Sequence, residues 1–205
     1  MNTFTRLYLI RHGQVINHDA GVYNGHNDVG LSNLGVRQME SVAWRLKDEN
    51  LDAVYCSDLI RSRAGGELVA REHGRDPLPD PSLRELHFGL WAGMTFMEIE
   101  ENYPGGLEAR SRDLIHFRPP EGESVGDLQD RVLPTVRSII EQHHGGSVAL
   151  VVHGGVNRVI LADALRLDVV NFYSIDQEYG CLNIIDYYRD LAVIKLINGR
   201  LQLDY

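Results

Sequence analysis

The sequence predicts an α/β protein in which a three-layer α/β/α sandwich holds a mostly parallel sheet with an antiparallel edge strand. Two observations carry this prediction. Short apolar runs without helical spacing alternate along the chain with longer stretches in which apolar residues recur at helical spacing. Near the C-terminus, apolar runs at residues 182–187 and 191–197 flank Tyr188-Arg189-Asp190, a pattern typical of a β-hairpin that adds an antiparallel strand.

The N-terminal part of the chain begins with a predicted strand. Residues 7–10 are continuously apolar, which favours a buried strand of a parallel sheet. Apolar residues at helical spacing then predict a helix over residues 32–50, with Ser32 as its N-cap. Residues 52–56 predict a second strand. Residues 58–72 predict a second helix, although two glycines in its middle each cost about 1 kcal/mol relative to alanine.

The C-terminal part repeats this alternation of helix and strand. Ser124 and Asp127 are spaced like a capping box and predict the start of a long helix, which Pro134 should kink. The apolar run at residues 147–152 predicts another strand, and a helical stretch follows from about residue 156 to residue 166.

Length and composition set further bounds. A chain of 205 residues, 43% of them hydrophobic, fits one domain over residues 1–205 with a full core. The formal charge of −9, with scattered acidic residues, argues against nucleic acid or an anionic membrane as a partner. Cys56 and Cys181 lack disulfide or metal-site spacing, and no signal peptide or membrane-spanning run is evident, so we expect a soluble protein of the cytoplasm. The sequence leaves a homodimer open.

Polar side chains follow three of the predicted strands, at the point where each strand ends. Arg11, His12 and Gly13 come directly after the first strand, Arg61 lies shortly after the second, and His153 follows a later one. Because ligands of open α/β sheets bind beyond the carboxyl ends of parallel strands, we expect these side chains to converge there. The sequence therefore predicts a local basic pocket that contains histidine.

Such a set of side chains suits a phosphoryl group. Phosphate needs positive charge, and the planar guanidinium of Arg11 offers donors that match its oxygens. One histidine can attack the phosphorus atom while the other binds, and Gly13 lacks a Cβ, which lets the backbone approach a ligand. The arginines also disfavour protonation of the attacking imidazole, which has to be neutral.

Six segments of the chain, taken in their order along the sequence, form a recognisable set of motifs. They are Leu9–Gln14, Asn17, Ser57–Arg61, Leu83–Gly93, Pro120–Ser124 and Val151–Gly155. In this order they resemble the motifs of the histidine phosphatase superfamily, which includes cofactor-dependent phosphoglycerate mutases and many small phosphatases. The resemblance spans nearly the whole chain and implies a single domain with a helical insertion near residues 95–120 that covers the active site.

The resemblance implies a phosphomonoester hydrolase that works through a phosphohistidine. His12 would be the nucleophile, and Glu85 would protonate the departing alkoxide and then take a proton from the water that hydrolyses the intermediate. The groups implied to hold the phosphate oxygens are Arg11, Asn17, Arg61, His153 and Gly154. No metal and no cofactor enter this scheme, and the partner is a small-molecule phosphate ester.

Three further segments resemble, less specifically, the α-ribazole phosphatases of cobalamin synthesis. They are Gly21–Asp28, Glu101–Tyr103 and residues 175–186, and they imply α-ribazole 5′-phosphate as substrate. Tyr23, His26 and His87 are the candidates for contacting the leaving group, although tyrosines and histidines in loops are more often ordinary solvated residues.

Four alternatives remain beside this interpretation. A phosphoglycerate mutase would carry extra loop length, a broad-specificity sugar phosphatase would share every phosphate-binding group, and a non-catalytic binding protein would lack His12 or Glu85, which are both present. The two motif histidines could share zinc with Asp58 or Glu85, but two arginines in the same pocket would repel a cation.

Overall fold

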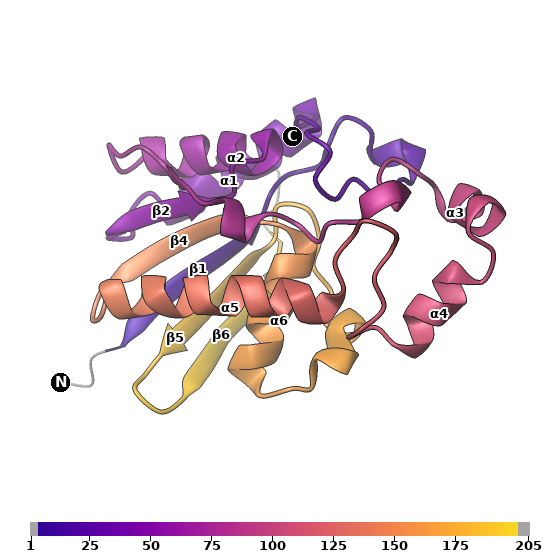
Figure 1. Ribbon diagram of the computed structural model, residues 1–205. Coiled ribbons are helices and arrows are strands. Elements are labelled where there is room, and N and C mark those ends of the chain that lie inside the picture. Colours follow the sequence, from indigo (N-terminus) through magenta and orange to yellow (C-terminus); the bar gives the residue numbers. More distant parts are fainter. Residues whose placement is uncertain (1–3, 201–205) are drawn as a thin grey trace.

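The computed structural model describes residues 4–200 and has at its centre a six-stranded sheet of order β3-β2-β4-β1-β5-β6 (Figure 1). The strands are β1 (Thr5–Arg11), β2 (Ala53–Cys56), β3 (Leu78–Pro79), β4 (Ser147–Val152), β5 (Leu182–Tyr187) and β6 (Ala192–Gly199). The first four are mutually parallel, whereas β5 runs antiparallel to both β1 and β6. The predicted sheet is confirmed, with its antiparallel part at one end, where β6 forms the edge.

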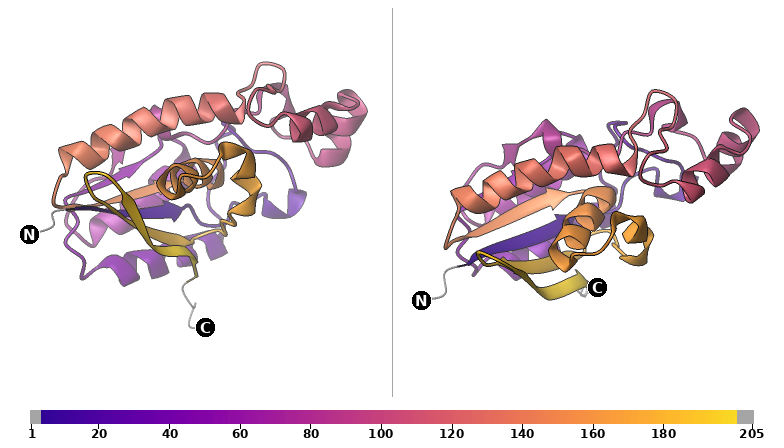
Figure 2. Two further views of the ribbon diagram at one scale, coloured as in Figure 1. Left: turned by 90° about the horizontal axis from the view of Figure 1, so that it is seen from below. Right: turned by 60° about the horizontal axis from the view of Figure 1, so that its bottom comes forward.

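Helices cover both faces of the sheet. α1 (Asn33–Leu46) and α2 (Ile60–Arg71) lie on one face, and α5 (Val125–Gln142) and α6 (Gly154–Leu165) lie on the other (Figure 2). The alternation of side chains along β1 explains the two layers, because Leu7 and Leu9 join the core under α5 and α6 while Tyr8 and Ile10 join the core under α1 and α2. The predicted three-layer sandwich is thereby confirmed.

Local sequence signals set the helix starts. The Ser32 hydroxyl accepts a hydrogen bond from the Gly35 amide at the start of α1, and Ser124 and Asp127 form a complete capping box at the start of α5. α5 continues through Pro134 as one helix, so the predicted kink does not interrupt it. α6 begins two residues earlier than expected, because His153 is already its extended N-cap.

The predicted insertion contains two short helices, α3 (Phe96–Asn102) and α4 (Gly106–Arg112). Both project from one end of the sandwich (Figure 1). Short 3-10 helices cover residues 18–20, 81–83, 89–91 and 169–174. The single domain predicted over residues 1–205 includes residues 1–3 and 201–205, which lie outside the described part. Within residues 4–200, no helix has both the length and the apolar character needed to cross a membrane.

The register of the parallel strands positions the candidate site. Arg11 pairs with Val152, and Val151 pairs with both Ile10 and Cys56. The chain therefore leaves β1, β2 and β4 at the same edge of the sheet, and the residues that follow these strands are brought together there.

Candidate active site

The two motif histidines lie side by side beyond β1 and β4. His12 is 4% exposed and His153 is fully buried. Their ring centroids are 5.1 Å apart at an interplanar angle of 67°. The predicted convergence of residues that are far apart in the sequence therefore places two imidazoles in contact.

His12 has one ring nitrogen occupied and one free. Its Nδ1 lies 2.7 Å from the backbone oxygen of Gly13, and because a carbonyl can only accept, Nδ1 carries the hydrogen. The lone pair of the neutral ring is then on Nε2. Burial, and after it the charges of Arg61 and Arg11, lower the pKa of His12 well below its ordinary value. The imidazole is therefore neutral and can act as a nucleophile.

Gly13 is required for a reason other than the one the sequence suggested. A Cβ at this position would lie 2.1 Å from the backbone oxygen of Gly35, in the first turn of α1. Glycine thus permits close packing of the turn after β1 against α1.

His153 is held by a neighbour that the sequence motifs did not single out for this purpose. Its Nε2 lies 2.7 Å from the hydroxyl of Ser57, directly after β2. Its Nδ1 is buried and has no hydrogen-bond partner within residues 4–200. Burial, followed by Arg61 and His12, lowers the pKa of His153 well below its usual range. The second ring is neutral as well, and in the Nδ1-H tautomer it can donate to a phosphate oxygen.

Two contacts hold the guanidinium of Arg11 in place, and one of its buried donors is left without a partner in the described chain. Its Nη1 donates to the backbone oxygen of Gln177 at 2.6 Å, and its guanidinium lies 3.8 Å from the ring centroid of Tyr179. Its Nε is buried without a partner in the described chain. A buried charged donor of this kind needs an acceptor, and an oxyanion would supply one.

Arg61 is 2% exposed and lies in the first turn of α2. It donates to the backbone oxygens of Asn27 at 2.8 Å and Gly25 at 2.6 Å. These bonds tie the loop after β1 to α2 and hold the guanidinium in one orientation. The two glycines predicted to weaken α2 allow it to pack closely, since a Cβ at Gly65 would lie 3.0 Å from Met39 and Val151 atoms.

Glu85 reaches the N-terminus of α6. Its Oε2 accepts a hydrogen bond from the Gly155 amide at 3.1 Å, and its Oε1 accepts one from the Leu86 amide at 2.9 Å. A Cβ on residue 155 would lie 2.2 Å from Glu85 Oε1, so glycine is needed there for this contact. The carboxylate is thereby aimed at the turn that also carries His153.

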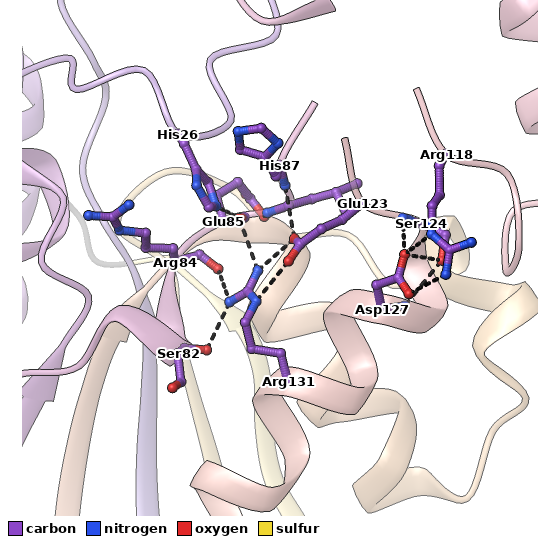
Figure 3. A network of polar contacts seen from close by, with 11 residues as sticks. His26, Ser82, Arg84, Glu85, His87, Arg118, Glu123, Ser124, Asp127 and Arg131 are labelled. Atoms are coloured by element: carbon purple, nitrogen blue, oxygen red, sulfur yellow. Dashed lines mark hydrogen bonds and ion pairs between the residues drawn. The ribbon is translucent and has the colours of Figure 1, made fainter. Parts of the chain in front are cut away.

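Arg131, on α5, secures the segment that carries Glu85 (Figure 3). It donates to the backbone oxygens of Ser82 at 2.9 Å, Arg84 at 3.0 Å and Glu85 at 3.3 Å. It also forms an ion pair with Glu123 at 2.8 Å. Sequence reasoning did not identify Arg131, because an arginine at one position of an amphipathic helix is usually a solvated residue.

A cavity of about 230 Å³ lies between these groups. Its lining brings together two of the phosphate-binding candidates, the nucleophile candidate, the predicted acid and two arginines that the sequence did not indicate, whereas His153 lies beside His12 but is not a lining residue. The principal lining residues are Arg11, His12, Tyr23, Arg61, Glu85, Phe88, Arg110, Arg158, Tyr173 and Tyr179. Four guanidinium groups against one carboxylate make the cavity locally basic although the chain carries a net charge of −9. It can hold a small anion and expose it to His12.

The remaining candidates are distributed unevenly around this cavity. Tyr23 lines it. Asn17 lies one step behind, since its side chain donates to the side chain of Asn24, a lining residue, at 2.7 Å. Gly154 opens α6 and lies close to Arg11, from whose Nε a Cβ would be 3.4 Å away.

His26 and His87 do not lie where the sequence suggested. Their rings pack against each other with centroids 4.5 Å apart, and neither is among the residues that line the cavity. His26 Nε2 instead lies 2.8 Å from the backbone oxygen of Glu85 (Figure 3). His26 therefore contacts the backbone of the segment that carries Glu85, and neither histidine contributes to the cavity lining.

The alternative of a zinc site has no geometric support in the described chain. Residues 4–200 contain no group of three or more histidine, cysteine, aspartate or glutamate side chains that could hold a metal ion. Asp58, one of the ligands considered, is engaged by Arg84 at 2.5 Å.

Comparisons with known proteins agree with this geometry. The sequence matches the model described as histidine phosphatase superfamily (branch 1) over residues 7–200. It is 26% identical over 195 residues to the adenosylcobalamin/alpha-ribazole phosphatase of Escherichia coli (strain K12), with 95% of this chain and 96% of that protein covered. It is 34% identical over 174 residues to the glucosyl-3-phosphoglycerate phosphatase of Mycolicibacterium vanbaalenii, with 82% and 77% covered.

Solved structures of both kinds of phosphatase are similar to this chain. A putative alpha-ribazole-5'-P phosphatase from Escherichia coli superposes with a TM-score of 0.88 at 26% identity, covering 96% of this chain and 97% of that one. A mycobacterial glucosyl-3-phosphoglycerate phosphatase in complex with VO3 superposes with a TM-score of 0.85 at 28% identity, covering 95% and 99%.

Proposed function

The chain belongs to the histidine phosphatase superfamily and is a phosphoric monoester hydrolase, and from that premise we propose that it works through a phosphohistidine on His12. The observation that carries this proposal is the state of the His12 ring. Its Nδ1 donates to Gly13, its pKa is lowered by burial and by Arg61 and Arg11, and it lines the basic cavity. A neutral imidazole with a free Nε2 beside bound phosphate is an activated nucleophile.

In the first step, phosphate oxygens accept hydrogen bonds from Arg11 Nε, the Arg61 guanidinium and His153 Nδ1. The lone pair of His12 Nε2 attacks phosphorus, and the phosphorus–oxygen ester bond breaks with its electrons on the leaving oxygen. Glu85, in its protonated form, gives that oxygen a proton. The positive charge that develops on the His12 ring is stabilised by the Gly13 carbonyl, which already accepts from Nδ1.

In the second step, Glu85 as carboxylate removes a proton from water, and the water oxygen attacks phosphorus. The phosphorus–nitrogen bond breaks, its electrons return to His12 Nε2, and inorganic phosphate leaves. The Gly155 amide, which donates to the carboxylate, and Arg131, which donates to the backbone oxygen, hold Glu85 in one place for both proton transfers.

Two classes of alcohol are proposed as the leaving group. The resemblance to α-ribazole phosphatases favours a nucleoside, as in α-ribazole 5′-phosphate, and the named relatives of that type are 26% and 28% identical to the chain. The 34% identical relative named for glucosyl-3-phosphoglycerate favours a hydroxy acid, released from a phosphorylated acid. The cytoplasmic location expected from the sequence stays part of the proposal, and a homodimer stays open. The proposed insertion that covers the site is supported by Arg110 of α4, which lines the cavity.

Labelling tests the mechanism directly. Incubation with a ³²P-labelled aryl phosphate and rapid acid-free quenching should place label on His12, and His12→Ala should abolish both label and turnover. His116→Ala, at a histidine that is 79% exposed, serves as the matched control. Turnover that a chelator removes, or that survives in His12→Ala, would overturn the mechanism. Conversion of 3-phosphoglycerate to its 2-isomer without phosphate release would indicate a mutase instead.

A further inference from the structure

Arg110 is a buried cation without a counter-ion. It belongs to α4, outside every motif that carries the proposed chemistry, and it is 7% exposed. Its Nη2 is buried and has no hydrogen-bond partner within residues 4–200, where no carboxylate forms an ion pair with it. Arg112, two residues further along the same helix, shows the ordinary alternative, since it is 77% exposed and paired with Glu108.

Aromatic rings surround Arg110 but do not accept hydrogen bonds from its N–H groups in the plane of the guanidinium. The guanidinium carbon lies 5.6 Å from the ring centroid of Phe88, 5.7 Å from that of Tyr173 and 6.0 Å from that of Tyr23. These distances are at the outer limit of a cation–π contact, which uses the faces of the rings. The N–H groups at the edge of the guanidinium still need acceptors, and leaving such donors buried and unpaired is costly.

Arg110 lines the same cavity as His12 but contacts other rings, since Tyr179 lies beside both His12 and Arg11, whereas the rings near Arg110 are those of Tyr23, Phe88 and Tyr173. Arg11, Arg61 and His153 already supply donors around His12, and the charges that lower the pKa of His12 are those of Arg61 and Arg11. Arg110 acts instead on Tyr23, whose pKa burial raises and Arg110 partly lowers. A substrate with its phosphate on His12 therefore extends its alcohol portion toward Arg110.

We infer that Arg110 forms a second anion subsite, which binds a carboxylate or a second phosphate on the alcohol portion of the substrate. The inference rests on the proposed function and deepens it. The guanidinium fork matches both oxyanions, and the rings of Tyr23, Phe88 and Tyr173 lie around it. The cavity of about 230 Å³ is smaller than most ligand pockets and suits a small phosphorylated acid.

The test uses two esters that differ only in the anion. Glycerol 3-phosphate and 3-phosphoglycerate share one carbon skeleton, but a hydroxymethyl group in the first is a carboxylate in the second. The wild-type enzyme should prefer 3-phosphoglycerate in kcat/KM by about tenfold to hundredfold, the range of a charged hydrogen bond. Glycerol 1,3-bisphosphate, compared in the same way, shows whether phosphate replaces the carboxylate.

Arg110→Met should lower the preference for the acid by at least about tenfold, and Arg110→Lys should retain part of it because the charge remains. Arg112→Met, which removes an exposed arginine from the same helix, should leave the preference unchanged. Thermal unfolding of each variant reports whether it folds. If Arg110→Met does not fold, the wild-type preference and Arg110→Lys still decide the matter.

Failure of this inference differs from failure of the proposed function. If the wild-type enzyme labels His12 from both glycerol esters and hydrolyses them equally, or prefers α-ribazole 5′-phosphate to all of them, the subsite is refuted while the mechanism stands. If Arg110→Met lowers kcat/KM alike for both esters, Arg110 is only a structural residue. If no ester labels His12 and none is hydrolysed, the proposed function itself fails.

Discussion

Replacing Arg131 with glutamine should impair proton transfer without removing any group from the cavity. Arg131 donates to the carbonyl oxygens of Ser82, Arg84 and Glu85, and it pairs with Glu123. Glutamine is too short and uncharged to make this set of bonds. The Glu85 segment then loses its support from α5, although the carboxylate keeps the amides of Gly155 and Leu86 and the backbone oxygen keeps His26, so the position of the carboxylate becomes less defined.

The Arg131→Gln substitution should lower both the catalytic rate and the stability of the fold. General acid catalysis contributes about 10²–10⁴ in rate, so partial misplacement of Glu85 should lower kcat by about tenfold to hundredfold. Breaking a buried ion pair costs about 3–5 kcal/mol, and because the side chains of Arg131 and Glu123 are 22% and 24% exposed, we expect about 2–3 kcal/mol of lost stability. Burial alone would raise the pKa of Glu123, but Arg131 lowers it overall, which agrees with a stabilising pair.

The assay varies the leaving group. Dinitrophenolate departs without a proton, whereas an alkoxide needs one. Arg131→Gln should therefore lower kcat/KM, which reports the step that releases the leaving group, strongly for an alkyl phosphate and weakly for dinitrophenyl phosphate. Arg118→Gln is the matched control, because Arg118 pairs with Asp127 at the same end of α5 without contacting the Glu85 segment (Figure 3). An equal loss for both leaving groups would refute the positioning role, since a merely destabilised enzyme loses activity toward every ester.

Gly155→Ala should lower kcat for alkyl phosphates by about tenfold or more and cost about 1–3 kcal/mol in thermal unfolding, because its Cβ would lie 2.2 Å from Glu85 Oε1. Gly30→Ala, where a Cβ meets nothing within 4 Å, is the control, and equal activity of the two variants would contradict this contact. The depressed pKa values of His12 and His153 predict acid sensitivity, since below about pH 6.5 the unfolded chain takes up protons that the folded protein does not. Stability should therefore fall as the pH drops from 6.5, by up to about 1.4 kcal/mol per pH unit for each histidine, until the folded-state pKa values are reached. Chemical denaturation at several pH values measures this slope, which should be smaller in His12→Gln; a slope of the same size would assign the effect to other groups.

Sequence patterns were sufficient for the framework of the site. Apolar runs and helical spacing predicted β1, β2, β4 and the hairpin of β5 and β6, because periodicity and capping depend on residues a few positions apart. Parallel strands end at one edge, so placing His12 and His153 after two of them was enough to predict that the rings meet. The six motif segments supplied Glu85 and Arg61.

Patterns failed for residues whose role depends on loops. His26 and His87 were expected at the leaving group, but their rings pack behind Glu85 and outside the cavity lining. Arg110 and Arg131 carried no signal, because an arginine on a helix is ordinarily exposed, as Arg112 is. Gly13 was assigned to ligand approach, whereas its partner is the backbone of α1.

The sequence by itself determined the fold class and the edge of the sheet at which the site lies, and its motifs indicated the groups proposed to meet phosphate. The fold class and the edge follow from short-range periodicity and from the common direction of parallel strands. Only the tertiary structure decided that Arg110 is buried at the cavity and which residues line the cavity beside the phosphate-binding groups. Those outcomes depend on how the segment around residue 23, the Glu85 segment, α4 and residues 172–179 pack over one cavity, and no local pattern encodes contacts between irregular segments so far apart in the chain.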